Sequence, residues 1–90
     1  MQRLFIMQLK PKIRPHLLWE YDLETFNWER SYKIVIERVV QRGWLDEWRE
    51  IYQFYKPEKI LETIEWSKQL DKRDKDFTRL FLNSDLLHAA

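Results

Sequence analysis

The spacing of apolar residues predicts a first helix in the second quarter of the chain. Apolar side chains recur at three- and four-residue intervals from Trp28 to Arg42, which is typical of a helix with one buried face. Asn27 precedes this stretch as a candidate N-cap, and Gly43, the only glycine in the chain, follows its basic last turn. We therefore expect a helix over about 28–42 that ends in a left-handed cap at Gly43.

The next apolar stretches predict two helices that meet at a tight corner. A second helix over about Leu45–Tyr55 begins with acidic residues, which suit the positive end of a helix dipole. Pro57 suits the first turn of a third helix over about 58–70, because its missing N–H has no partner there.

A fourth helix is expected over about 72–83. Asp71 and Asp74 resemble a capping box at its start, with Asp in place of the usual Glu. The residues expected to face the core are Phe77, Leu80 and Phe81.

The first 15 residues predict a basic, extended arm. In the segment 10–15, KPKIRP, each proline biases the preceding residue toward extended geometry. Residues 16–26 carry many apolar side chains and predict a turn or short helix that lies across the core. We expect residues 1–90 to form a single all-α domain, in which a compact four-helix core over 16–90 follows the arm over 1–15.

Composition narrows the chemistry that is open to this chain. Sixteen basic and fifteen acidic residues give a formal net charge of +1, so no strong overall field attracts nucleic acid or a membrane. No cysteine is present, which favours a reducing compartment, and we expect a cytoplasmic protein. No apolar run has the length of a signal peptide core or of a membrane span.

The sequence contains no recognisable catalytic or metal site. Its two histidines, His16 and His88, lie near opposite ends of the chain and do not have the spacing of zinc ligands. A single glycine excludes a P-loop and a dinucleotide-binding turn. We expect no cofactor, no metal and no enzymatic activity, and an enzyme of an unrecognised type is the last of three hypotheses.

Aromatic residues provide the first functional hypothesis, a surface that binds another protein. The chain has five Trp, four Tyr and five Phe, and these rings either fill the core or also anchor a partner. Trp66 lies off the apolar stripe of its helix, so we expect it to be exposed. The candidate partner-binding residues are Trp44, Trp48, Tyr52, Tyr55 and Trp66.

Basic residues provide the alternative hypothesis, a DNA-binding regulator. If the third and fourth helices form a helix-turn-helix, basic side chains around their corner would contact phosphates, with the arm as a second contact. Interleaved acids at Asp71, Asp74 and Asp76 would cancel much of this attraction, so an ordinary solvated face is the competing interpretation. The candidate residues are Lys10, Lys12, Arg14, Lys72, Arg73, Lys75 and Arg79.

From about His16 onward the sequence resembles a small family of uncharacterised bacterial helical proteins. The residues that carry the resemblance are the run 18–22 (LWEYD), the stretch 36–43 (IERVVQRG), Trp48, Tyr55 and the run 70–72 (LDK). Members of that family are typically encoded beside nucleotidyltransferase-type abortive-infection toxins. The resemblance therefore implies an antitoxin-like or accessory role. We expect a protein partner, which is either the product of a neighbouring gene or a second copy of the chain.

Overall fold

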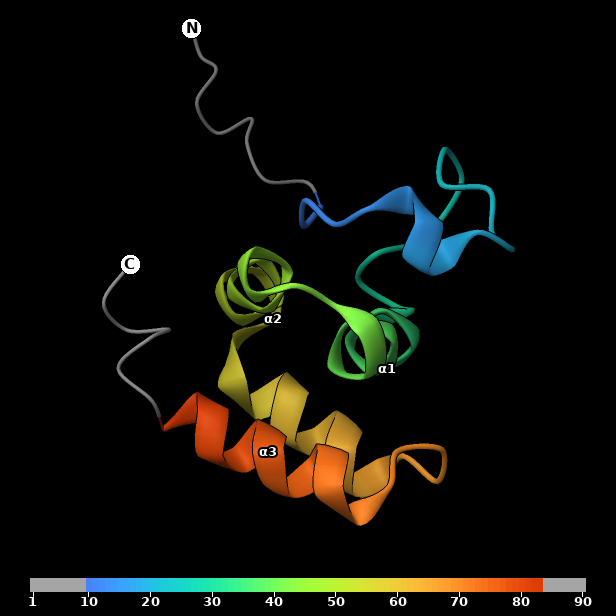
Figure 1. Ribbon diagram of the computed structural model, residues 1–90. Helices are drawn as coiled ribbons and strands as arrows, with labels where there is room; N and C mark the ends of the chain where they lie inside the picture. The colour runs from blue at the N-terminus through green and yellow to red at the C-terminus, as the bar shows by residue number, and fades with distance from the viewer. Residues whose placement is uncertain (1–9, 84–90) are drawn as a thin grey trace, which may run out of the picture.

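The computed structural model describes residues 10–83, which form one short 3-10 helix and three α helices (Figure 1). The 3-10 helix, η2, spans Pro15–Leu18, and helix α1 spans Tyr32–Arg42. Helix α2 spans Leu45–Trp66, and helix α3 spans Lys72–Leu82. No strand occurs in this part of the chain, so all the regular secondary structure of residues 10–83 is helical. None of these helices has the length and apolar character needed to cross a membrane.

Helix α1 begins at Tyr32, later than the apolar spacing predicts. Asn27 does not cap it, because its side-chain oxygen accepts a hydrogen bond from the Arg30 N–H at 2.9 Å and closes a turn. Trp28 lies in this turn, where its buried ring packs edge-on against Phe26 with 4.7 Å between the ring centroids. The ring reaches the core from a turn, which explains why helical spacing placed it in the helix.

Gly43 follows α1 as predicted, but its backbone is extended, with φ −77° and ψ 158°. Its N–H donates a hydrogen bond to the carbonyl of Val39 at 2.7 Å. A Cβ at this position would lie 2.6 Å from Val39 Cγ1 and 2.7 Å from the Val39 carbonyl oxygen. Close packing therefore requires the glycine, and the prediction of a left-handed cap is wrong.

Helix α2 covers the predicted second helix and residues 58–66 of the predicted third helix, so the expectation that the third helix continues to residue 70 is wrong. The two parts meet at Lys56, whose φ of 74° and ψ of 157° are not helical. Pro57 follows it, and a residue before proline is sterically disfavoured in the helical region. The predicted corner is thus a kink inside one helix, and residues 10–83 contain three α helices in place of the four predicted.

The end of α2 and the start of α3 are joined by polar contacts. Asp71 caps α3 as predicted, because its carboxylate accepts a hydrogen bond from the Asp74 N–H at 2.9 Å. Lys75 donates from Nζ to the carbonyl of Ser67 at 2.7 Å. These contacts fix the loop between α2 and α3.

The buried face of α3 differs from the predicted face. Phe81 is buried as expected, but Phe77 and Leu80 are exposed. Thr78 and Leu82 take the buried positions, so α3 is rotated from the predicted orientation. The hydroxyl of Thr78 donates to a carbonyl one turn earlier, at 2.8 Å, which allows a polar side chain to be fully buried.

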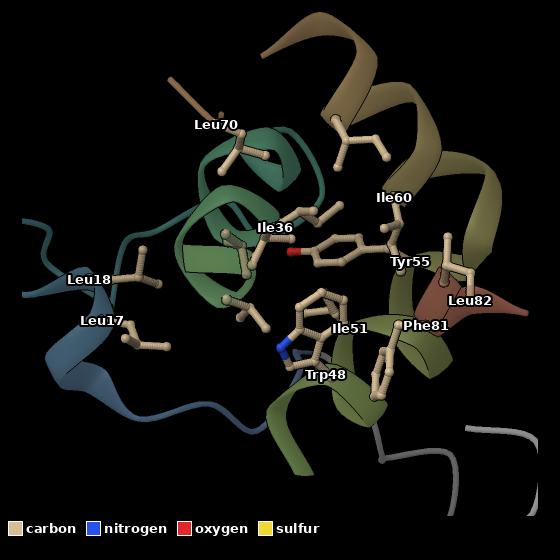
Figure 2. Packing of buried hydrophobic residues seen from close by; sticks show 14 of the residues in the cluster. Leu17, Leu18, Ile36, Trp48, Ile51, Tyr55, Ile60, Leu70, Phe81 and Leu82 are labelled. Atoms are coloured by element: carbon tan, nitrogen blue, oxygen red, sulfur yellow. The ribbon is translucent and has the colours of Figure 1, made fainter. Parts of the chain in front are cut away.

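The core lies between α1 and both parts of α2, and η2 and α3 close its sides (Figure 2). Tyr55 points into it from α2, and its hydroxyl donates to the carbonyl of Trp28 at 2.7 Å. The rings of Trp48 and Phe81 pack edge-on, with 4.7 Å between their centroids. Leu17 and Leu18 of η2 are buried in this core, as predicted for the apolar segment after the arm.

Candidate functional site

The predicted partner-binding residues of α2 divide into buried and exposed rings. Trp48 and Tyr55 are buried in the core, because their spacing along α2 places both on the face toward α1 and α3. Tyr52 is half-buried and packs against that core. Trp44 and Trp66 are 59% and 53% exposed, which confirms the expectation for Trp66. Buried rings are not accessible to a second molecule, so we remove Trp48 and Tyr55 from the candidate set.

Trp44 lies beside a complete ion pair, and we call Arg14, Trp44 and Glu47 the Arg14 cluster. The Arg14 guanidinium stacks on the Trp44 ring, with Cζ 3.7 Å from the ring centroid. The same guanidinium donates to Glu47 at 2.9 Å from Nε and at 3.0 Å from Nη2. It also donates to the carbonyl of Arg42 at 3.0 Å. Arg14 therefore ties the arm to the end of α1 and the start of α2.

Glu47 is the centre of the Arg14 cluster and is only 2% exposed. Besides the guanidinium, the backbone N–H groups of Arg14 and Trp44 each donate to its carboxylate at 2.8 Å. Burial raises the pKa of Glu47, but these hydrogen bonds from Arg14 and Trp44 together outweigh burial and hold the pKa below its ordinary value of 4.5. The bond to the Trp44 N–H is one half of a capping box at the start of α2.

The arm residues that the structure describes lie against the start of α2. The N–H of Lys12 donates to Glu50 at 2.8 Å, and Lys10 Nζ lies 5.9 Å from the centroid of the Trp28 ring. A groove of about 430 Å³ runs between this segment and the residues around Trp44. Residues 1–9 of the predicted arm lie outside the described residues.

Most basic side chains proposed to contact DNA are engaged within the protein. Lys72 and Arg79 both pair with Asp76, at 2.7 Å and 3.4 Å. Lys75 is held by the end of α2, and Arg14 is held by Glu47. The exposed members of the set are Lys10, Lys12, Lys72, Arg73 and Arg79. Acidic partners therefore reduce the positive charge available on α3 for phosphates.

Trp66, the last residue of α2, borders a second hollow, which we call the Glu37 hollow. It has a volume of about 470 Å³ and lies between α1 and the loop that precedes α3. The residues that line it are Glu37, Trp66, Lys68 and Gln69. Within residues 10–83, no group of three or more His, Asp or Glu side chains is placed to hold a metal ion.

Glu37 is only 7% exposed and belongs to the buried face of α1. The hydroxyl of Ser67 donates to its Oε2 atom, and the same hydroxyl accepts the Leu70 N–H at 3.2 Å. No other donor within residues 10–83 forms a hydrogen bond with this carboxylate, and no cation there forms a salt bridge with it. Arg38, the next residue on α1, interacts with it only through the attraction of opposite charges. Glu37 is thus a buried carboxylate with a single neutral donor, on the wall of a hollow.

A lysine lies over Trp66 without reaching that carboxylate. Lys33, one turn before Glu37 on α1, places Nζ 4.6 Å from the centroid of the Trp66 ring. Among the described residues it forms no ion pair with Glu37. The ring of Trp66 therefore already lies beneath a cation, whereas the acid beside it has no salt bridge.

Residues 13–64 match the model of a Family of unknown function (DUF6922), which covers more than half of the chain. The chain belongs to DUF6922. No curated protein and no solved structure matches it. The segment that DUF6922 covers includes the whole Arg14 cluster and Glu37, but it ends before Trp66 and Ser67.

Three residues of this DUF6922 member escaped the sequence analysis. Trp19 is 74% exposed but lies in a segment that was expected to pack on the core. Glu37 was named only as part of the run 36–43, and Lys33 was given no role. A signal for Glu37 existed, because it is a single acid placed between the apolar pairs 35–36 and 39–40.

Proposed function

We propose that this chain is a cytoplasmic, non-enzymatic protein-binding module, which acts as an antitoxin-like or accessory partner of another protein. One observation carries the proposal: Trp19, Trp44 and Trp66 are each more than half exposed, at 74%, 59% and 53%. A buried indole removes about 150–250 Å² from water, so these rings leave much stabilising surface unused in the monomer. Tryptophan is also the residue type most enriched among the hot spots of protein interfaces.

The two exposed rings at the ends of α2 are held in place in the absence of a partner. Arg14 stacks on Trp44, and Lys33 lies over Trp66. A cation above an indole face is attractive and restricts the ring. A side chain that is already ordered loses less conformational entropy on binding, so both rings suit the role of interface anchors.

The class of partner comes from the family resemblance given by the runs 18–22 and 36–43. Proteins of that resemblance are typically encoded beside nucleotidyltransferase-type toxins. We therefore propose that the partner is the product of the adjacent gene, and that this chain restrains its activity by covering part of its surface.

Co-purification tests this proposal directly. The full chain is produced together with the tagged product of the adjacent gene, and the affinity of the complex is measured for wild type, Trp44→Ala and Trp66→Ala. Each substitution should weaken binding by about tenfold or more, as expected for loss of a hot-spot tryptophan. Both positions are exposed, so the near-ultraviolet circular dichroism of the remaining rings should be retained.

Leu80→Ala is the control, because Leu80 is an apolar residue of α3 that is even more exposed, at 69%, and lies away from both tryptophans in sequence. It should leave the affinity unchanged. Full retention of the complex by both tryptophan variants would overturn the proposed function.

A further inference from the structure

Two buried glutamates lie beside the two exposed tryptophans at the ends of α2. The two glutamates differ in the groups that donate hydrogen bonds to them. Glu47 receives two hydrogen bonds from a guanidinium that also stacks on Trp44. Glu37 receives one hydrogen bond from the Ser67 hydroxyl and lines a hollow beside Trp66. The same combination of a tryptophan and a buried carboxylate therefore has a salt bridge at one end of α2 and none at the other.

We propose that the Glu37 hollow binds an arginine side chain of the partner protein. The guanidinium stacks on Trp66 and donates charge-assisted hydrogen bonds to Glu37. This inference rests on the proposed function and names the residue by which the partner is anchored.

The burial of Glu37 and its single hydrogen bond support a cationic occupant. Transfer of a carboxylate from water into a protein interior is strongly unfavourable unless hydrogen bonds or an opposite charge compensate. One hydroxyl, shared with the Leu70 N–H, is a weak substitute for the four donors that Glu47 receives. The charge of Glu37 also disfavours an anionic occupant such as a phosphate or a partner's acidic side chain.

The hollow can hold a guanidinium, and arginine suits it better than lysine. Pockets of about 300–1,000 Å³ take whole small-molecule ligands, so a volume of about 470 Å³ is ample for one side-chain end. A guanidinium is planar and can stack on an indole while it pairs with a carboxylate, whereas an ammonium is a compact point charge. Lys33 illustrates this limit, because it lies over Trp66 without an ion pair to Glu37.

Two lysines lie near the hollow, and their side chains must move when a guanidinium binds. Lys68 is exposed and lines the hollow, and Lys33 lies over the ring of Trp66. Long lysine side chains keep their charged ends in water and rearrange at small cost. We therefore expect an incoming guanidinium to replace Lys33 on Trp66, which makes Lys33 a competitor of the proposed ligand.

The test uses acetyl-arginine amide as the probe and the full chain as the protein. The indole N–H resonances are followed by NMR during a titration, with the signal of Trp66 identified from a Trp66→Phe variant. Acetyl-arginine amide should shift this signal saturably, with a dissociation constant in the millimolar range. Acetyl-citrulline amide, which has the same shape without the charge, should bind about tenfold more weakly or not at all.

Two substitutions assign the effect to the hollow. Glu37→Gln should weaken arginine binding by about tenfold, because the amide oxygen still accepts from Ser67 but carries no charge. Lys33→Met should strengthen binding by about two- to threefold, because it removes a competing cation from the ring. The signal of Trp44 should not respond in any of these samples, because Arg14 already covers that ring.

Several results would overturn the inference: no saturable shift of Trp66, equal binding of the citrulline compound, or equal binding to Glu37→Gln. Weaker binding to Lys33→Met would also contradict it. Its failure is distinguishable from failure of the proposed function. A partner complex that needs Trp66 but tolerates Glu37→Gln sinks only the arginine site, whereas a complex that tolerates both tryptophan substitutions sinks the proposed function.

Discussion

The two ends of α2 show how one pair of residue types, a tryptophan and a buried glutamate, acquires two different roles. At the first end, Arg14 comes from the same chain and neutralises Glu47, and the result is a joint between the arm, α1 and α2. At the other end, Lys33 lies on Trp66, and Glu37 forms no salt bridge and accepts its one hydrogen bond from a neutral hydroxyl. A carboxylate that forms a salt bridge within its own chain stabilises the fold. A carboxylate without a salt bridge can still bind a cation from another molecule.

Glu47→Ala should have the largest effect of the changes that test this difference. It removes the acceptor of four hydrogen bonds, including the one to the N–H of Trp44 at the start of α2. We expect the free energy of unfolding to fall by about 3 kcal/mol, measured by urea denaturation. Glu50→Ala is the control, because Glu50 accepts one bond, from Lys12, and should lose less than about 1 kcal/mol. Equal losses for the two variants would contradict the special role of Glu47.

Ser67→Ala should be the next largest change, with a loss of about 2 kcal/mol. It removes the only donor that Glu37 has in residues 10–83 and the acceptor of the Leu70 N–H. The same substitution in a Glu37→Gln background should lose only about 1 kcal/mol, because no buried charge is then left without a donor. Additive losses in this double-mutant cycle would show that the hydroxyl contributes nothing through Glu37.

Acid should reduce the stability that the Arg14 cluster contributes, by less than the loss expected for Glu47→Ala or Ser67→Ala. The pKa of Glu47 is lower in the folded protein than its ordinary value of 4.5, so its contribution is complete above that pH. It is lost as the pH falls through the folded pKa. Denaturant unfolding of wild type between pH 7 and pH 2 should therefore show a steeper loss of stability than unfolding of Glu47→Gln.

Part of the acid sensitivity should remain in Glu47→Gln. The hydrogen bond from Arg38 lowers the pKa of Glu20 to about 2, so this carboxylate also favours folding until the pH approaches that value. Identical pH profiles for wild type and Glu47→Gln would contradict the role assigned to Glu47.

Glu37→Gln should have the smallest effect on stability, and the opposite sign. It keeps an acceptor for Ser67 but removes a buried charge that has no salt bridge, so the free energy of unfolding should rise by about 0.5–1 kcal/mol. Thermal and urea unfolding measure this change. Destabilisation by more than about 1 kcal/mol would mean that Glu37 is already compensated within the protein, and the difference between the two ends would disappear.

The helical content was predictable from sequence because the apolar spacing is local. The spacing of residues 35, 36, 39 and 40 marks the buried face of α1, and Pro57 marks the kink in α2. The limits of α1 were less predictable, since Asn27 forms a turn with its own neighbours and Gly43 is required by contact with Val39. The rotation of α3, which exposes Phe77 and Leu80, depends on how it packs against α2.

The candidate site was predictable only where local spacing decides exposure. Trp66 lies off the stripe of Ile60 and Ile64, and its exposure was expected for that reason. The pairs that define the two ends of α2 are separated by about thirty residues, as in Arg14 with Glu47 and Glu37 with Ser67. No periodic pattern predicts such contacts, because they arise only when the arm and α1 pack against the two ends of α2.

The backbone at Lys56 has a consequence for anyone who wishes to use this protein as a scaffold. A side chain at positive φ is strained by about 1–2 kcal/mol, a penalty that glycine does not suffer. Lys56→Gly should therefore make the protein more stable without altering the tryptophan at either end of α2. Such a variant would tolerate the destabilising changes needed to reshape the hollow for other cationic residues.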